Sequence, residues 1–168
     1  QVGKKTASLS LIQIKGGKAK ELKGRLSFSN PHGLRDMNFE GLTACDVNQD
    51  DLLDLVVVGY SHWESLRDKF NLVDGRDGLQ NLLFINQGNL HFKEESVARG
   101  LSKTQYSYVA ECTDFDDDGD ADIFIGNDYG QNVFYENRGQ GQFVEDASHP
   151  FSRAHGFSMG ISRADYDN

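Results

Sequence analysis

The chain has 168 residues, a formal charge of −9, 18 glycines and only two prolines. Its length suffices for one domain with a sizeable core, and the many glycines favour short strands and turns over long helices. The negative charge argues against a nucleic-acid partner, because phosphate backbones bind basic surfaces, and no apolar run is long enough to span a membrane.

A β-hairpin is the first element that the sequence predicts. Apolar and polar side chains alternate in Ala7-Ser-Leu-Ser-Leu-Ile-Gln-Ile-Lys15, and the pattern turns at Gly16-Gly17. Alternation beside a two-glycine turn is typical of two short antiparallel strands. The following stretch, Ser27–Asp36, contains Pro31 and Gly33 and therefore predicts a connecting loop.

Four strands come next, and an acidic loop joins the first two. The loop reads Asp46-Val-Asn48-Gln-Asp50-Asp51-Leu-Leu-Asp54, with side-chain oxygens at its first, third, fifth and ninth positions. A long insertion, Ser61–Leu79, separates the second strand from the third. The predicted strands, which are short and bounded by turn residues, are Phe39–Cys45, Leu53–Tyr60, Asn81–Asn86 and His91–Ser96.

The same order of elements then returns. A second acidic loop, Asp114-Phe-Asp116-Asp-Asp118-Gly119-Asp120-Ala-Asp122, starts 68 residues after the first, and a third begins 51 residues later with Asp165-Tyr-Asp167. The insertion accounts for most of the difference between these spacings. A period of about 50 residues with four short strands fits a β-propeller blade. The strands of the second repeat are predicted at Ser107–Thr113, Ala121–Asn127, Asn132–Glu136 and Gln142–Glu145.

The acidic loops are of a kind that binds a hard cation. Ca²⁺ takes about six to eight oxygen ligands, and alternate side chains of a tight loop converge on one point. The EF-hand shares the first half of this pattern, but it needs a glutamate at position twelve and a helix after it. Here position twelve is Val57 in the first loop and Ile125 in the second, each inside an apolar run typical of a buried strand. The EF-hand is therefore excluded, and each loop joins two strands.

These repeats resemble the FG-GAP/VCBS repeats of integrin-α-like β-propellers. The likeness rests on each acidic loop with the apolar strand after it, and on two downstream segments, Gln80-Asn81…Asn86…Phe92 and Gln131-Asn132…Asn137…Phe143. It implies an all-β chain of roughly two to three four-stranded antiparallel β-propeller blades, as a fragment of a larger propeller.

The resemblance divides the chain into four parts. Residues 1–38 would be the outer strands of a preceding partial blade with a connector, and residues 39–103 a blade that holds the insertion. Residues 104–157 would form the next blade, and residues 158–168 the start of a further one.

The resemblance also assigns calcium ligands to the loops. Twelve of the 26 acidic residues lie in the three acidic segments, so ion binding explains the net charge well. Two departures in the first loop predict weaker binding there: Asn48 replaces a carboxylate, and Asp51 stands where glycine is expected. The implied ligands of two complete calcium sites and a third begun are Asp46, Asn48, Asp50, the Leu52 carbonyl, Asp54, Asp114, Asp116, Asp118, the Asp120 carbonyl, Asp122, Asp165 and Asp167.

The two cysteines occupy nearly equivalent places in the repeats. Cys45 precedes its acidic loop by one residue, and Cys112 precedes the next loop by two. On equivalent strands this offset turns the two side chains toward opposite faces, and opposite faces of successive propeller blades look at each other. The offset predicts a disulfide between blades, with two buried free thiols as the alternative.

We expect a binding module rather than an enzyme. The sequence Gly156-Phe-Ser158-Met-Gly160 matches a nucleophile-elbow pattern, but Ser158 falls on a first strand of the repeat, where the required helix is missing. The insertion should protrude from the end opposite the calcium loops and bind a protein or glycan ligand. Its candidate contact residues are His62, Trp63, Arg67 and Arg76.

The expected location is extracellular, secreted or at the cell surface, with the periplasm as a further possibility. Affinities of the order of 10⁻⁴–10⁻³ M are typical of extracellular calcium modules, and such sites fill only where calcium is abundant. Two other functions stay open: a self-assembling cell-surface or filament subunit, and a scaffold domain of a secreted polysaccharide-acting enzyme.

Overall fold

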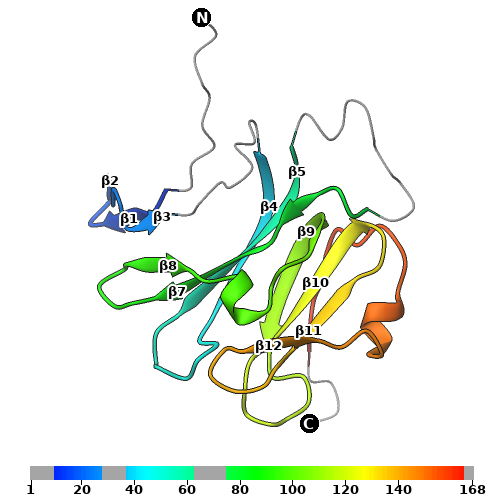
Figure 1. The fold of residues 1–168 in the computed structure, drawn as a ribbon. Helices are drawn as coiled ribbons and strands as arrows, with labels where there is room; N and C mark the ends of the chain where they lie inside the picture. Colours follow the sequence, from blue (N-terminus) through cyan, green and yellow to red (C-terminus); the bar gives the residue numbers. More distant parts are fainter. Residues whose placement is uncertain (1–9, 28–36, 63–74, 165–168) are drawn as a thin grey trace, which may run out of the picture.

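The computed structural model describes residues 10–27, 37–62 and 75–164. Its strands form two five-stranded sheets and one two-stranded sheet (Figure 1). In the described residues the helical elements are two short 3₁₀ helices, η1 (Val97–Arg99) and η2 (Pro150–Arg153). The predicted fold class, an all-β chain of blade-like antiparallel meanders, is confirmed.

The first sheet contains the first repeat. Four strands follow one another as an antiparallel meander: β4 (Met37–Cys45), β5 (Asp54–His62), β7 (Leu82–Asn86) and β8 (Phe92–Glu94). A short strand from the N-terminal segment, β3 (Leu26–Ser27), adds to β8 in parallel orientation.

The second sheet contains the second repeat. Its meander consists of β9 (Thr104–Thr113), β10 (Asp122–Tyr129), β11 (Val133–Asn137) and β12 (Phe143–Glu145). The short strand β6 (Leu79–Gln80) pairs with β9 and completes the five strands. Because β6 immediately precedes β7 of the first sheet, the chain itself links the two blades.

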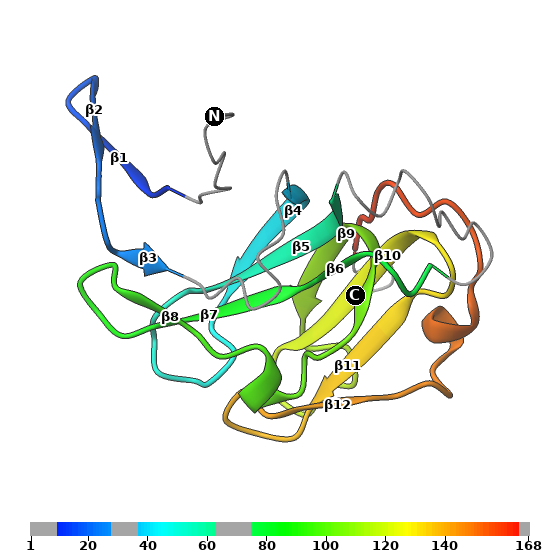
Figure 2. The same cartoon turned by 45° about the horizontal axis from the view of Figure 1, so that its top comes forward.

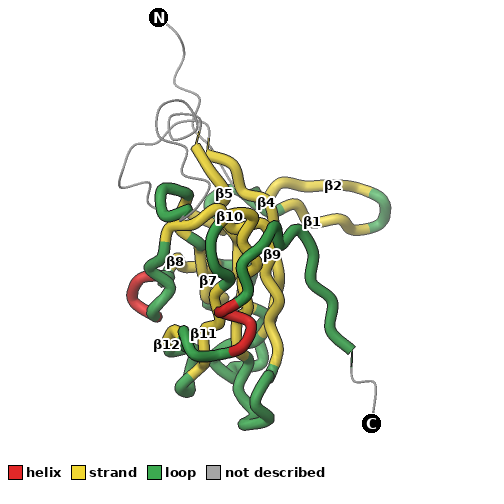
Figure 3. The backbone as a smooth tube through the Cα atoms, turned by 90° about the vertical axis from the view of Figure 1, so that its right-hand side faces the viewer, coloured by secondary structure: helices red, strands yellow, loops and turns green. Residues whose placement is uncertain are grey.

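The N-terminal hairpin forms a sheet of its own. Strands β1 (Ile12–Lys15) and β2 (Lys18–Glu21) pair around the predicted Gly16-Gly17 turn. Figures 2 and 3 show the hairpin projecting from the rest of the described chain. Its assignment to a preceding blade stays a prediction. At the other end, residues 158–164 contain no strand, although the Ser158 N–H donates to the Asn127 carbonyl at 3.0 Å.

The main core lies between the two sheets. Val56 and Val58 of β5 share a cluster with Ile123 and Ile125 of β10, and none of the four is exposed to solvent. The intervening Val57 belongs to a second cluster that also contains Leu82, Phe84 and Phe92. Burial on both faces explains why the strands read as continuous apolar runs rather than as alternating ones.

A glycine permits the close approach of the sheets. A Cβ atom on Gly41 of β4 would lie 2.9 Å from the Tyr108 carbonyl oxygen and 2.8 Å from Cγ2 of Val58. Only a residue without a side chain fits between these neighbours, so β4 packs closely on β9.

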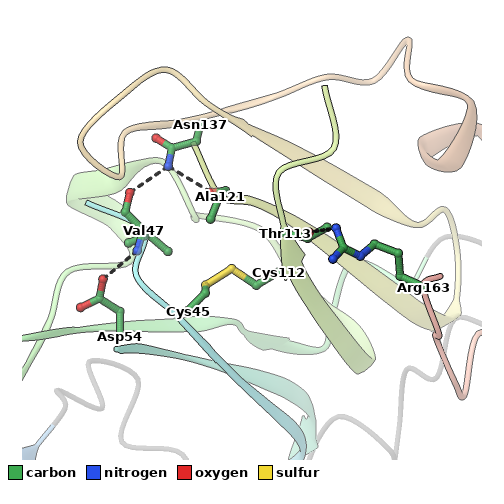
Figure 4. Close-up of a disulfide and its surroundings, with 8 residues drawn as sticks. All are labelled: Cys45, Val47, Asp54, Cys112, Thr113, Ala121, Asn137 and Arg163. Atoms are coloured by element: carbon green, nitrogen blue, oxygen red, sulfur yellow. Dashed lines mark hydrogen bonds between the residues drawn. A yellow bond between two sulfur atoms is a disulfide. The ribbon is translucent and has the colours of Figure 1, made fainter. Parts of the chain in front are cut away.

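A disulfide joins the two sheets beside the acidic loops. Cys45 is the last residue of β4 and Cys112 lies near the end of β9, with their Cα atoms 6.2 Å apart (Figure 4). The bond lies between successive blades, where the offset between the two cysteines places it.

Removal of the disulfide is expected to destabilise the protein. The two cysteines are 67 residues apart, and a cross-link over a loop of this length restricts the unfolded chain by about 4 kcal/mol in the chain-entropy account. The Cys45→Ser/Cys112→Ser variant should lose about 2–5 kcal/mol of unfolding free energy in urea denaturation. Two alkylatable thiols in the unreduced protein, detected by mass spectrometry, would contradict the disulfide.

Candidate metal sites

The two acidic loops lie at the same end of the molecule. Residues 46–54 connect β4 to β5 and residues 114–122 connect β9 to β10, and both loops lie along the lower edge in Figure 1. They touch each other, because the Gln49 side chain donates a hydrogen bond from Nε2 to the Gly119 carbonyl at 3.1 Å.

The first aspartate of each loop accepts hydrogen bonds from backbone N–H groups later in the same loop. In the first loop, Asp46 accepts hydrogen bonds from the backbone N–H groups of Asp50 at 3.1 Å and Asp51 at 2.7 Å. Asp51 takes the left-handed conformation with φ of 65°, which aspartate tolerates better than most residues. The loop therefore closes although glycine is missing from this position.

The second loop has the same hydrogen bonds to its first aspartate and the same left-handed position. Asp114 accepts from the backbone N–H groups of Asp118 at 3.2 Å and Gly119 at 2.9 Å, and Gly119 has φ of 96°. The N–H of Asp120 donates to the Asp118 carboxylate at 2.9 Å. These bonds fix the loop backbone while leaving further lone pairs on the carboxylate oxygens.

The aspartate at position nine is buried in both loops. Asp122 is 1% exposed and accepts from the N–H groups of Phe115 at 3.1 Å and Asn137 at 2.8 Å. Asp54 is fully buried and accepts from the equivalent N–H groups of Val47 and Asn86 at 3.1 and 2.8 Å. Burial raises the pKa of both carboxyls, neighbouring aspartates raise it further, and the N–H donors oppose this shift.

Three carboxylates of the second loop converge. Asp114, Asp116 and Asp122 each offer an oxygen, and these oxygens lie within 4.8 Å of one another. The structure does not bring Asp118 into this group. Three hard anionic oxygens at such distances repel one another, and they match the ligands that Ca²⁺ prefers.

In the first loop, a different feature indicates cation binding. No such group of three carboxylates forms there in the described part of the chain, because Asn48 replaces one of them. The Asn48 Nδ2 donates to Asp50 at 3.0 Å, whereas its Oδ1 is buried without a hydrogen-bond partner. An unsatisfied buried acceptor costs about 1–3 kcal/mol, and a cation in the loop would supply the missing partner. Both loops thus fit a hard cation.

The remaining predicted site residues fall into three groups. Leu52 and Asp120 lie in the loops as expected, and the role of their carbonyls as ligands stays a prediction. In the insertion, His62 is the last residue of β5 and pairs with Met37, and Arg76 is exposed. Those outside the described residues are Trp63, Arg67, Asp165 and Asp167.

Sequence reasoning gave no role to the asparagines that hold the loops. Asn137 is 1% exposed, and its Nδ2 donates to the Ala121 carbonyl of its own loop at 3.0 Å and to the Val47 carbonyl of the preceding loop at 2.8 Å (Figure 4). Its Oδ1 accepts from the N–H groups of Gly139 and Gly141, both at 3.1 Å. A signal existed, since each repeat has two asparagines five residues apart, at 81 and 86 and at 132 and 137.

The fold and loops together define a class of protein. Each five-stranded sheet contains a four-stranded meander with an oxygen-rich loop between the first and second strands of the meander, which is the architecture of a β-propeller blade. Residues 114–168 match the family model described as FG-GAP-like repeat. The chain thus contains an FG-GAP-like repeat, as the sequence resemblance predicted. The comparison with curated proteins gave no match.

The described residues contain no membrane-spanning helix. None of their helices has the length and hydrophobicity that crossing a bilayer requires.

Truncation of the two equivalent asparagines should have unequal effects. Asn86 donates from Nδ2 to Leu53 at 3.0 Å, whereas Asn137 also bonds the buried Val47 carbonyl of the other blade. Asn137→Ala should therefore lose about 1–3 kcal/mol more unfolding free energy than Asn86→Ala, because it leaves more buried groups unsatisfied. Urea denaturation of both variants provides the comparison, and equal losses would show that the inter-blade bond adds no stability.

Proposed function

We propose that this chain is a calcium-binding module in which two ions stabilise successive propeller blades. The convergence of Asp114, Asp116 and Asp122 carries this proposal. An ion there neutralises their repulsion and holds the connection between β9 and β10 in place. Binding to the folded loop alone adds directly to the stability of the folded state.

The donor set favours calcium over other metals. The converging groups are carboxylate oxygens, with an amide oxygen from Asn48 in the first loop. Zinc prefers nitrogen and sulfur ligands, and magnesium keeps several waters in a strict octahedron. A loop that offers many oxygens suits the larger and less demanding calcium ion.

The proposed location is outside the cytosol. The Cys45–Cys112 bond supports it, because disulfides form and persist in oxidising compartments. Calcium loops of modest affinity also need a calcium-rich environment. We therefore place the protein in a secreted, cell-surface or periplasmic setting.

The working role is binding rather than catalysis. The ion loops occupy one end of the blades, which leaves the opposite end for a protein or glycan partner, as in adhesion. Connections at the ends of a rigid β-scaffold commonly carry the contact residues. The calcium ions would then keep the scaffold rigid instead of contacting the partner.

A ligand and a neighbouring aspartate of one loop provide a matched test. Asp116→Asn should weaken calcium binding to the second loop by about tenfold or more, because a charged oxygen of the convergent group is lost. Asp117→Asn removes the same charge from an exposed residue with φ of 61°, a conformation that asparagine tolerates. Calorimetric titration should show a much smaller loss for Asp117→Asn. Similar losses for the two variants would refute the assigned site.

Calcium affinity should also fall as the pH is lowered. Burial raises the pKa of Asp54 and Asp122, and both carboxyls must be deprotonated to hold a cation. Protons therefore compete at a higher pH than for ordinary aspartates, and calcium binding releases the protons that these carboxyls hold. Titrations in buffers of different ionisation enthalpy measure this release, and an affinity that does not fall as the pH is lowered would contradict the expectation.

A further inference from the structure

A polar cleft lies at the end of the second blade away from the acidic loops. Its volume is about 750 Å³, within the range of roughly 300–1,000 Å³ that is usual for ligand sites. The start of β9, the turn between β10 and β11 and the segment after β12 surround it. Because β9 runs toward the acidic loop and β10 runs away from it, these parts lie opposite the proposed calcium sites.

A buried side-chain oxygen among the described residues of this cleft has no hydrogen-bond partner. Gln105 of β9 is 6% exposed, and its Nε2 donates to the Gln131 carbonyl at 3.3 Å. That bond fixes the orientation of the amide, since a flipped amide would turn oxygen toward oxygen. The Oε1 atom is left buried without a hydrogen bond. An acceptor in this state favours a ligand that brings a hydrogen-bond donor.

The repeat itself does not require a glutamine at this place. Gln105 lies nine residues before Asp114, and the residue nine places before Asp46 is Met37. By contrast, the neighbouring Gln131-Asn132 pair recurs in the first blade as Gln80-Asn81. Gln105 is therefore a particular feature of the second blade, and the shared blade architecture does not account for it.

The charge of the cleft is opposite to that of the chain. Among the described residues, Arg76, Lys103 and His155 line it together with a single carboxylate, Glu145, although the chain carries −9 overall. Lys103 donates to Glu145 at 2.5 Å, and both side chains are partly exposed. Such a pair contributes little stability, so an anionic group of a ligand can share the lysine at low cost.

We propose that this cleft binds an acidic saccharide. A ring hydroxyl would donate to Oε1 of Gln105, and the sugar carboxylate would accept from Lys103 and Arg76. The remaining described lining residues are polar, small or glycine, without an aromatic or branched aliphatic side chain. This composition suits a hydroxyl-rich ligand better than a peptide, whose binding relies on apolar and aromatic anchors. This proposal names a ligand class for the binding role proposed above, and it rests on that role.

Calorimetry with digalacturonate tests the cleft. In calcium-containing buffer we expect saturable binding of one digalacturonate per chain. The dimethyl ester of the same disaccharide, which lacks the charges, should bind about tenfold more weakly. Absence of saturable binding to the folded protein would overturn the proposal. So would inorganic phosphate that binds the cleft as tightly as digalacturonate, because the site would then recognise an anion only.

Three variants assign the binding to named residues. Lys103→Gln and Gln105→Met, the latter with the residue of the first blade, should each weaken digalacturonate binding by about tenfold. Lys93→Gln is the matched control, because Lys93 also pairs with a glutamate, Glu95, at 2.8 Å but lies outside the cleft. It should change the affinity by less than about twofold. Equal losses for Lys93→Gln and Lys103→Gln would overturn the site.

Calcium titration of the same samples separates this proposal from the preceding one. A protein that binds digalacturonate but not calcium would refute the calcium sites and leave the cleft supported. A protein that binds calcium but not digalacturonate would refute the saccharide cleft and leave the calcium sites supported. If Gln105→Met fails to fold, the partly exposed Lys103 still provides the decisive variant.

Discussion

The structure depends on a buried carboxylate at the ninth position of each acidic loop. Asp122 begins β10, and its two oxygens accept from the N–H of Phe115 in the loop and of Asn137 at the end of β11. One side chain thus joins the loop to two strands. A buried charge is costly unless hydrogen bonds or a counter-ion compensate it. The two N–H donors supply part of this compensation, and the proposed cation supplies the rest.

This arrangement also connects the blades. The backbone N–H of Asn137 donates to Asp122, and its side-chain amide donates to the Val47 carbonyl of the preceding loop. The disulfide lies beside both loops. The position of one loop is therefore coupled to the position of the next. An ion that orders one loop would stabilise the contact between blades as well as the blade that holds it.

Much of the fold was predictable because its signals are local. The strands of both repeats were predicted to within a few residues, since apolar runs such as Leu55–Val58 are bounded by acidic loops and turns. The disulfide followed from the parity of side chains along a strand, which needs only the sequence positions of Cys45 and Cys112. The left-handed position of Asp51 likewise follows from its alignment with Gly119.

Features that depend on distant partners were not predictable. The pairing of β6 with β9 joins residues 79–80 to the other blade, and no local pattern indicates which sheet a two-residue strand enters. Asn137 and Gln105 were overlooked for the same reason. Their roles arise from the Val47 carbonyl and from a cleft that residues far apart in sequence create. Part of the insertion, including Trp63, lies outside the described residues, so its predicted role stays a prediction.

The melting temperature with and without calcium tests the central claim most directly. At about 10 mM calcium and a dissociation constant of about 10⁻⁴ M, each ion adds about 2.7 kcal/mol to the stability. With two ions bound, the melting temperature should then lie about 10–20 °C above its value in EDTA, with the disulfide intact in both samples. An unchanged melting temperature in EDTA would contradict a structural role for calcium.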